Sequence, residues 1–325
     1  MIRSIMPVSA LLALIAAAAS PASAQPDSGL QTFFTENVGL SQAQIAAIGS
    51  GEPVAKTLPA RTPAEVFLFG AVYIQALRNL TSGWSTISSA FAGSPVIWRS
   101  ECSRNLPNFR TPMAFRSTAT TPGHYGSASQ GLPDPDACEH HRRAPIERLL
   151  AYQREGNRAL GVYNDKRDPT EVSRQFAYLL SYEKALPERL PDFYRYLLAY
   201  PDAKPANVED TFYWARVKFG LKPTLRIVHV VTMRGNPAGA VAYAIAEKQL
   251  YASHYFETAL DLSFCVRAAG NPKRPGFYLI MDMGSEQAGL TGVQGFVVRK
   301  AAVGRSVSSL RDALATIKNV LEGNQ

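Results

Sequence analysis

Two histidines and a glutamate are the residues of this sequence whose types and spacing come closest to acid–base chemistry. His254 and Glu257 lie within residues 248–266, which read as one long strand, and His229 lies within "TLRIVHVVTM". Because side chains alternate between the two faces of a strand, His254 and Glu257 point to opposite faces and cannot act as a pair. His229 and His254 each share a face with apolar neighbours. The sequence therefore predicts two histidines that line one cavity if both faces point inward.

Each histidine has two interpretations that the sequence leaves open. It is either a core residue that makes one hydrogen bond, or a polar group that fixes a ligand's head group inside an apolar pocket. If the opposite face points inward, Glu257 is a buried carboxylate that needs a partner, and Arg226 is the candidate. The predicted cavity lining is His229, His254, Phe256, Leu260, Trp214, Tyr243, Arg226 and Glu257.

Familiar catalytic motifs do not occur in this sequence. There is no G-x-S-x-G, no H-E-x-x-H and no phosphate-binding glycine loop. "SYEK" at 181–184 lacks the other elements of serine acyl enzymes, and "CEHH" at 138–141 lacks a second pair of ligands at zinc-finger spacing. We therefore expect no metal, no cofactor and no catalytic set. An enzyme that uses His229 or His254 as a general base is the second hypothesis.

The N-terminus has the pattern of an export signal. Arg3 precedes the apolar run "PVSALLALIAAAAS", and "ASA" follows as a small-residue cleavage site. The sequence thus predicts a signal peptide over residues 1–24 and a periplasmic or secreted protein. Because such a compartment is oxidising, we expect a disulfide between Cys102 and Cys138, which leaves Cys265 buried and unpaired.

The chain is basic, with a formal net charge of +8 over 325 residues. The densest basic cluster is "HHRRAPIER" at 140–148. This cluster is either a solvated face or a contact for an anionic membrane surface. Nucleic acid is excluded as a partner because the protein is predicted to be exported.

The order of predicted elements gives an α+β chain. A helical lead with Ser41 as N-cap precedes a strand at 64–76, and residues 100–137 are rich in Pro, Gly and Ser. Helices are expected at 144–165, 168–185 and 186–201, and antiparallel strands at 210–219, 224–233, 239–250, 251–266 and 276–283. A last helix at 288–322 carries an apolar stripe of Val303, Val307, Leu310, Leu314, Ile317 and Leu321.

This order resembles the helix-grip fold of the START-like superfamily, in which a curved antiparallel sheet wraps a long C-terminal helix and leaves a cavity between them. The resemblance covers residues 64–322 as one domain, after a lead at 25–63. It places an inserted loop and an extra helical layer at about 98–205. This inserted region is longer than the corresponding region of most family members. The resemblance implies an apolar small molecule or lipid as ligand; some members are cyclases or hydrolases. The chain is also similar to secreted bacterial proteins, and a non-catalytic envelope-interaction protein is a further alternative.

Overall fold

The computed structural model describes residues 24, 26–75, 97–98, 147–163, 170–219, 222–252, 256–268, 275–287 and 292–323. Six sequence predictions lie wholly or mostly outside these ranges: the signal peptide, the Cys102–Cys138 disulfide, the 100–137 loop, the "CEHH" cluster, the basic cluster at 140–148 and the placement of His254. They stay predictions. Cys265 is buried and has a free thiol.

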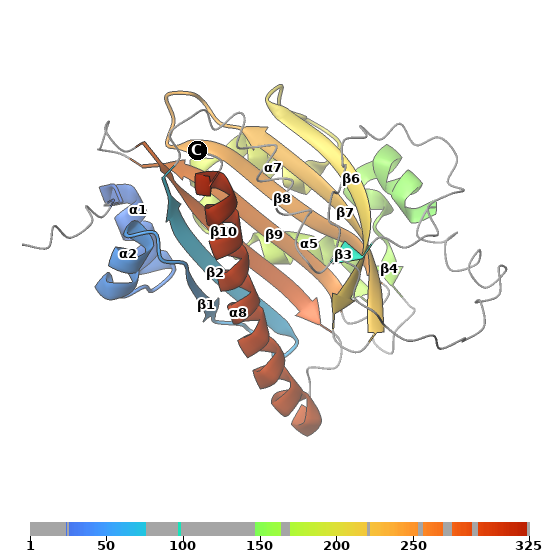
Figure 1. Ribbon diagram of the computed structural model, residues 1–325. Helices are drawn as coiled ribbons and strands as arrows, with labels where there is room; N and C mark the ends of the chain where they lie inside the picture. Colours follow the sequence, from blue (N-terminus) through green and yellow to red (C-terminus); the bar gives the residue numbers. More distant parts are fainter. Residues whose placement is uncertain are drawn as a thin grey trace, which may run out of the picture.

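An antiparallel sheet forms the centre of the fold (Figure 1), as the alternating pattern of the second half predicts. Its strand order is β1-β2-β10-β9-β8-β7-β6-β3. The strands are β1 (Val54–Leu58), β2 (Glu65–Ile74), β3 (Ile97–Trp98), β6 (Val208–Phe219), β7 (Lys222–Arg234), β8 (Val241–Ala252), β9 (Phe256–Arg267) and β10 (Phe277–Gln287). Neighbours β6 to β10 follow one another in sequence, whereas β2 joins the sheet beside the last strand.

The C-terminal helix α8 (Gly292–Gly323) covers one face of the sheet. Leu310, Leu314 and Ile317 are buried against side chains of β1, β2 and β10, and Val303, Val307 and Leu321 pack around them. The predicted apolar stripe is confirmed, because its side chains recur at helical spacing and meet the apolar face of the sheet.

The other face of the sheet carries shorter helices. At the β1–β2 side these are α1 (Ser28–Thr32), the turn η1 (Phe33–Asn37) and α2 (Gln42–Gly49), whose Phe34 and Ile48 are buried with Phe69 and Tyr278. Ser41 is the N-cap of α2, as predicted, and forms a capping box in which its hydroxyl accepts from the Gln44 N–H.

The middle of the chain packs on the β7–β9 part of the same face. It comprises a helix over 147–155, η3 (Gly156–Ala159), α5 (Val172–Leu180), α6 (Leu186–Arg189) and α7 (Pro191–Ala199), with the short pair β4 (Val162–Tyr163) and β5 (Thr170–Glu171). Figure 1 shows α5 and α7 on the side of the sheet opposite α8. Buried side chains from these helices and from β7, β8 and β9 form one apolar cluster.

Five element predictions are wrong in ways that have local causes. Residues 251–266 are not one strand, because β8 continues to Ala252 and β9 begins at Phe256, and the sequence between them contains no Gly or Pro. The helix predicted at 186–201 is two helices, because Pro191 disfavours helical backbone at Leu190. The helix expected from 168 begins at Val172 instead. The helix predicted at 144–165 ends before Gly156, whose φ of +63° is not helical, and residues 162–163 form β4. The five-residue strand β1 was missed, because it is too short for its alternation to be recognised.

Gly70 in β2 allows α8 to approach the sheet closely. A Cβ at Gly70 would lie 2.8 Å from Leu314 Cδ1 and 3.0 Å from Leu310 Cγ. We expect Gly70→Ala to lower the free energy of unfolding by about 1–2 kcal/mol, because overpacking displaces the helix. Gly304→Ala is the matched control: Gly304 is on α8 with open space around it, and the change should raise stability by about 1 kcal/mol. Urea denaturation measures both, and equal stability of Gly70→Ala and the parent would contradict this packing.

Candidate functional site

One row of paired residues crosses the sheet on the face covered by the middle helices. Phe212 of β6 pairs with His229 of β7, His229 with Lys248 of β8, and Lys248 with Leu260 of β9. Directly opposite residues of an antiparallel pair place their side chains on the same face, about 5 Å apart. The row therefore puts a histidine and a lysine side by side beneath the helices.

His229 is fully buried and binds a carboxylate. Its Nε2 lies 2.7 Å from Asp210 Oδ1, and its ring stacks on Phe212 with a centroid distance of 4.5 Å. Burial lowers the pKa of His229 to about 4, despite the opposing effect of the hydrogen bond to Asp210. The imidazole is therefore neutral at pH 7.

Asp210 is the carboxylate that pairs with His229, and it is ionised. Burial alone would raise its pKa, but hydrogen bonds from His229, Lys204 and Tyr196 lower the value to about 2. Lys204 Nζ and Tyr196 OH each lie 2.7 Å from Asp210 Oδ2. Because the ionised carboxylate can only accept, His229 must carry its proton on Nε2.

Tyr152 connects this histidine to the lysine. Its hydroxyl lies 2.9 Å from His229 Nδ1 and 3.3 Å from Lys248 Nζ. Since Nδ1 has no proton, Tyr152 donates to it, and the tyrosine oxygen accepts from Lys248. The hydrogen bonds therefore run in one direction, from Lys248 through Tyr152 and His229 to Asp210.

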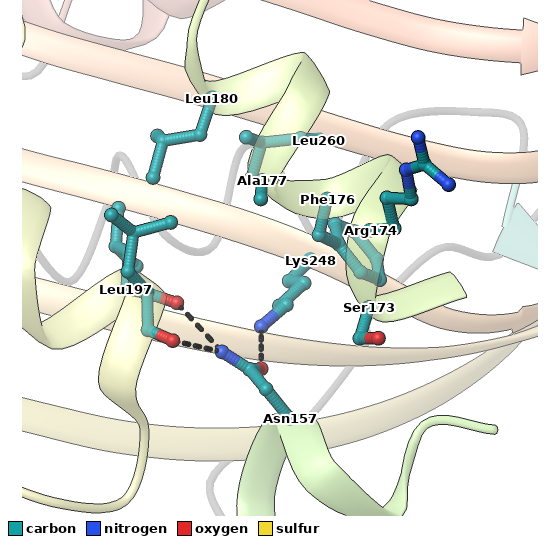
Figure 2. A pocket seen from close by; sticks show the side chains of 10 residues that line it. Asn157, Ser173, Arg174, Phe176, Ala177, Leu180, Leu197, Lys248 and Leu260 are labelled. Atoms are coloured by element: carbon teal, nitrogen blue, oxygen red, sulfur yellow. Dashed lines mark hydrogen bonds between the residues drawn. The ribbon is translucent and has the colours of Figure 1, made fainter. Parts of the chain in front are cut away.

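Lys248 has a second acceptor in Asn157, which lies on η3. The lysine amine donates to Asn157 Oδ1, while Asn157 Nδ2 donates to the carbonyl oxygens of Leu197 and Leu198 (Figure 2). The amide is thus held by the end of α7 and gives the amine a second acceptor besides Tyr152.

A cavity of about 230 Å³ opens at this amine. Figure 2 shows that its wall comes from α5, α7, η3 and the sheet. The apolar part is Phe176, Ala177, Leu180, Leu197, Leu198 and Leu260, and the polar part is Asn157, Ser173, Arg174 and Lys248. The lining holds two cationic side chains and no carboxylate. A mostly apolar wall with a few polar groups is the usual composition of a small-molecule site.

Lys248 is 3% exposed, and burial lowers the pKa of its amine from 10.5 to about 7. Its Nζ also lies 4.8 Å from the centre of the Phe176 ring. None of the contacts above brings a carboxylate to the amine. A substantial neutral fraction at pH 7 is the consequence of this environment.

The structure places the sequence-predicted residues on two different faces. His229 and Leu260 belong to the helix-covered face, and Leu260 lines the cavity. Tyr243 is buried in the cluster beneath α8 instead. Arg226 lies on that α8-side face as well, where its Nε donates to Gln249 Oε1 at 2.6 Å. His229 and Leu260 therefore share one face of the sheet, on either side of Lys248, and of these two only Leu260 lines the cavity. Tyr243 and Arg226 lie on the other face.

The remaining predicted residues are only partly described. The backbones of Trp214, Phe256 and Glu257 belong to β6 and β9, while their side chains and all of His254 lie outside the described part of the chain. The pairing of His229 with His254 in one cavity therefore stays a prediction.

Sequence reasoning missed Lys248, Asp210, Tyr152 and Asn157. A signal for Lys248 was present in "GAVAYAIAEKQL", where it shares a strand face with Ala244, Ala246 and Leu250. A lysine in an otherwise apolar alternation indicates a buried amine. Tyr152 and Asn157 come from a distant helix and turn, so no spacing rule connects them to the sheet.

No protein-family model matches the sequence, and no curated protein matches it. Among solved structures, a START superfamily protein from Mycobacterium smegmatis is similar at 19% identity and a TM-score of 0.23, covering 47% of this chain and 88% of that chain. The di-domain ARO/CYC StfQ from the steffimycin biosynthetic pathway is similar at 15% identity and a TM-score of 0.24, covering 59% of this chain and 61% of that chain. These likenesses are too weak to identify a ligand, so the chemistry of the cavity must do so.

Two further observations hold for the described residues. They contain no helix that is both long and apolar enough to cross a membrane. They also contain no group of three or more His, Cys, Asp or Glu side chains arranged to hold a metal ion.

Proposed function

We propose that this protein binds a small, mainly apolar molecule in the cavity at Lys248. The cavity itself is the observation that carries the proposal: an aliphatic and aromatic wall surrounds one buried amine. The sequence resemblance implied an apolar ligand between the sheet and the C-terminal helix. The proposed site lies on the other face, between the sheet and α5 and α7.

The shape and charge of the cavity define the ligand class. An apolar cavity of ~150 Å³ accommodates benzene, so 230 Å³ suits a small ring or a short chain rather than a sterol. The ligand's polar end is an oxygen, because the protonated amine of Lys248 has a third N–H beyond the two that Tyr152 and Asn157 accept, and Arg174 adds positive charge. Arg174 is largely exposed and pairs with Glu171 at 3.8 Å, which places it at the outer part of the wall.

In this proposal the domain is helix-grip-like, with α5, α6 and α7 as an added layer that forms the site. The protein acts after export, on the basis of the signal pattern in residues 1–24. The hydrogen bonds that the Lys248 amine donates to Asn157 and Tyr152 pre-position it, so a ligand does not have to immobilise it on binding.

Blocking the cavity tests the proposal. Ala177 of α5 lines the cavity, and we expect Ala177→Trp to fill it and weaken the binding of hexan-1-ol, a short apolar probe with one oxygen, by at least about tenfold. Titration calorimetry measures the affinity. Ala301→Trp, at an exposed position on α8, is the matched control and should leave binding unchanged. Equal affinity of the parent and Ala177→Trp would place the site elsewhere.

A further inference from the structure

The two hydrogen bonds of Lys248 determine which direction on its nitrogen is left for a ligand. A neutral primary amine has two N–H donors and one lone pair. Tyr152 OH accepts one of the N–H groups and Asn157 Oδ1 accepts the other. Both donors are therefore used by the protein, and the lone pair is the remaining direction at a nitrogen that lines the cavity.

Residues that do not touch Lys248 fix the direction of both of its hydrogen bonds. Asp210 accepts from His229 Nε2, which leaves Nδ1 to accept from Tyr152, so the tyrosine proton points away from Lys248. Asn157 cannot reverse its amide without losing the two donations to Leu197 and Leu198. Neither neighbour can donate to the amine, so neither can occupy its lone pair.

A desolvated amine with an available lone pair is a nucleophile toward carbonyl carbon. Exposed lysines are protonated at neutral pH and have no lone pair to offer. Among the groups that line the cavity, Lys248 combines this chemistry with an apolar wall that accommodates the rest of a small carbonyl compound.

We infer that Lys248 forms a reversible imine with a small apolar aldehyde or ketone bound in the cavity. This inference rests on the proposed function and specifies its ligand class. Asn157, Tyr152, His229 and Asp210 act as positioning residues, because they orient the amine and do not touch the carbonyl carbon.

The reaction balances without an oxidant, a reductant or another reactant. The nitrogen lone pair attacks the carbonyl carbon, a C–N bond forms, and the C=O π electrons move to oxygen. One nitrogen proton passes to that oxygen to give the carbinolamine. The C–O bond then breaks, the oxygen leaves as water with the second nitrogen proton, and a C=N bond remains.

The test is reductive trapping with hexanal as the probe. The purified protein is incubated with hexanal and sodium cyanoborohydride at pH 7, and mass spectrometry of intact protein and peptides locates the hexylated lysine. We expect trapping at Lys248 at least about tenfold faster than at any exposed lysine, because those are almost entirely protonated at this pH.

Two variants and a second probe separate the outcomes. Lys248→Met should lose the fast adduct while Lys184→Met, at an exposed position, keeps it. A near-UV circular dichroism spectrum that matches the parent's shows that Lys248→Met is folded. Trapping spread evenly over exposed lysines, or an undiminished adduct in Lys248→Met, would overturn the imine. If hexan-1-ol binds and hexanal is not trapped at Lys248, the imine fails and the proposed function stands. If neither probe binds, both fail.

Discussion

Replacing Lys248 with methionine is expected to remove a rise in stability between pH 7 and pH 9. The pKa of this amine is about 7 in the folded protein, against an ordinary value of 10.5. Between these values the unfolded chain binds more protons than the folded chain, so the free energy of unfolding increases with pH. The shift corresponds to a penalty on the order of 4 kcal/mol near pH 7, which fades toward pH 10.5.

Lys248→Met has no such penalty, and it fills a similar volume in an apolar site. We expect it to be about 1–3 kcal/mol more stable than the parent at pH 7, with the difference shrinking as pH rises. Urea denaturation of both proteins at each pH isolates the lysine, because all other titrating groups are common to them. Lys184→Met should follow the parent. A constant difference between Lys248→Met and the parent from pH 7 to pH 9 would show that the amine keeps its ordinary pKa.

Asp210→Ala is expected to lower the free energy of unfolding by about 3 kcal/mol. The substitution leaves the His229 Nε2–H, the Tyr196 hydroxyl and the Lys204 amine without their common acceptor, and His229 is fully buried. A buried donor left unsatisfied costs about 1–3 kcal/mol. The matched control is Asp202→Ala, which removes an exposed pair with Arg158 and should change stability by less than about 1 kcal/mol.

The pH dependence of stability is a second test of the hydrogen bonds to Asp210. Because the folded pKa of Asp210 lies below its ordinary value, its contribution is present at neutral pH and is lost as pH falls toward 2. His229 titrates in the same range, with a pKa of about 4, so the comparison is made in a His229→Phe background. There the protein that retains Asp210 should lose more stability than the one with Asp210→Ala between pH 5 and pH 2, measured by urea denaturation. A parallel loss in both proteins would mean that Lys204 and Tyr196 do not hold Asp210 in its ionised form.

The sequence predicted the parts of the fold that rest on local periodicity. The alternation in 210–250 gives three strands, and the 4-3-4-3-4 spacing of apolar residues gives α8 and the face that it buries. Both signals are repeated along the element, so one exception does not hide them. The break between β8 and β9 was missed because "YASHY" is as strand-forming as its flanks and carries no turn residue.

Of the residues around the cavity, the sequence predicted only two, and both lie on strands of the sheet. His229 and Leu260 could be placed on strand faces by alternation, and both lie on the helix-covered face. Which face bears the cavity depends on how the middle helices pack, and alternation within a strand contains no information about that. Asp210 was taken as the edge of a strand, and its partnership with His229 depends on the pairing of β6 with β7.

The pairing of β2 with β10 has a consequence for how the chain folds. Residues 65–74 hydrogen-bond to residues 277–286 across the sheet, so an early strand completes its pairing only when nearly the whole chain is available. Contacts of such large sequence separation slow folding, because the ends of a long loop must meet before any stabilisation is gained. Until β10 arrives, β2 has only β1 beside it, and its other edge is unpaired. We therefore expect the folding rate of this protein to depend on its C-terminal third. A chain truncated before β10 would leave one edge of β2 unpaired and prone to aggregation.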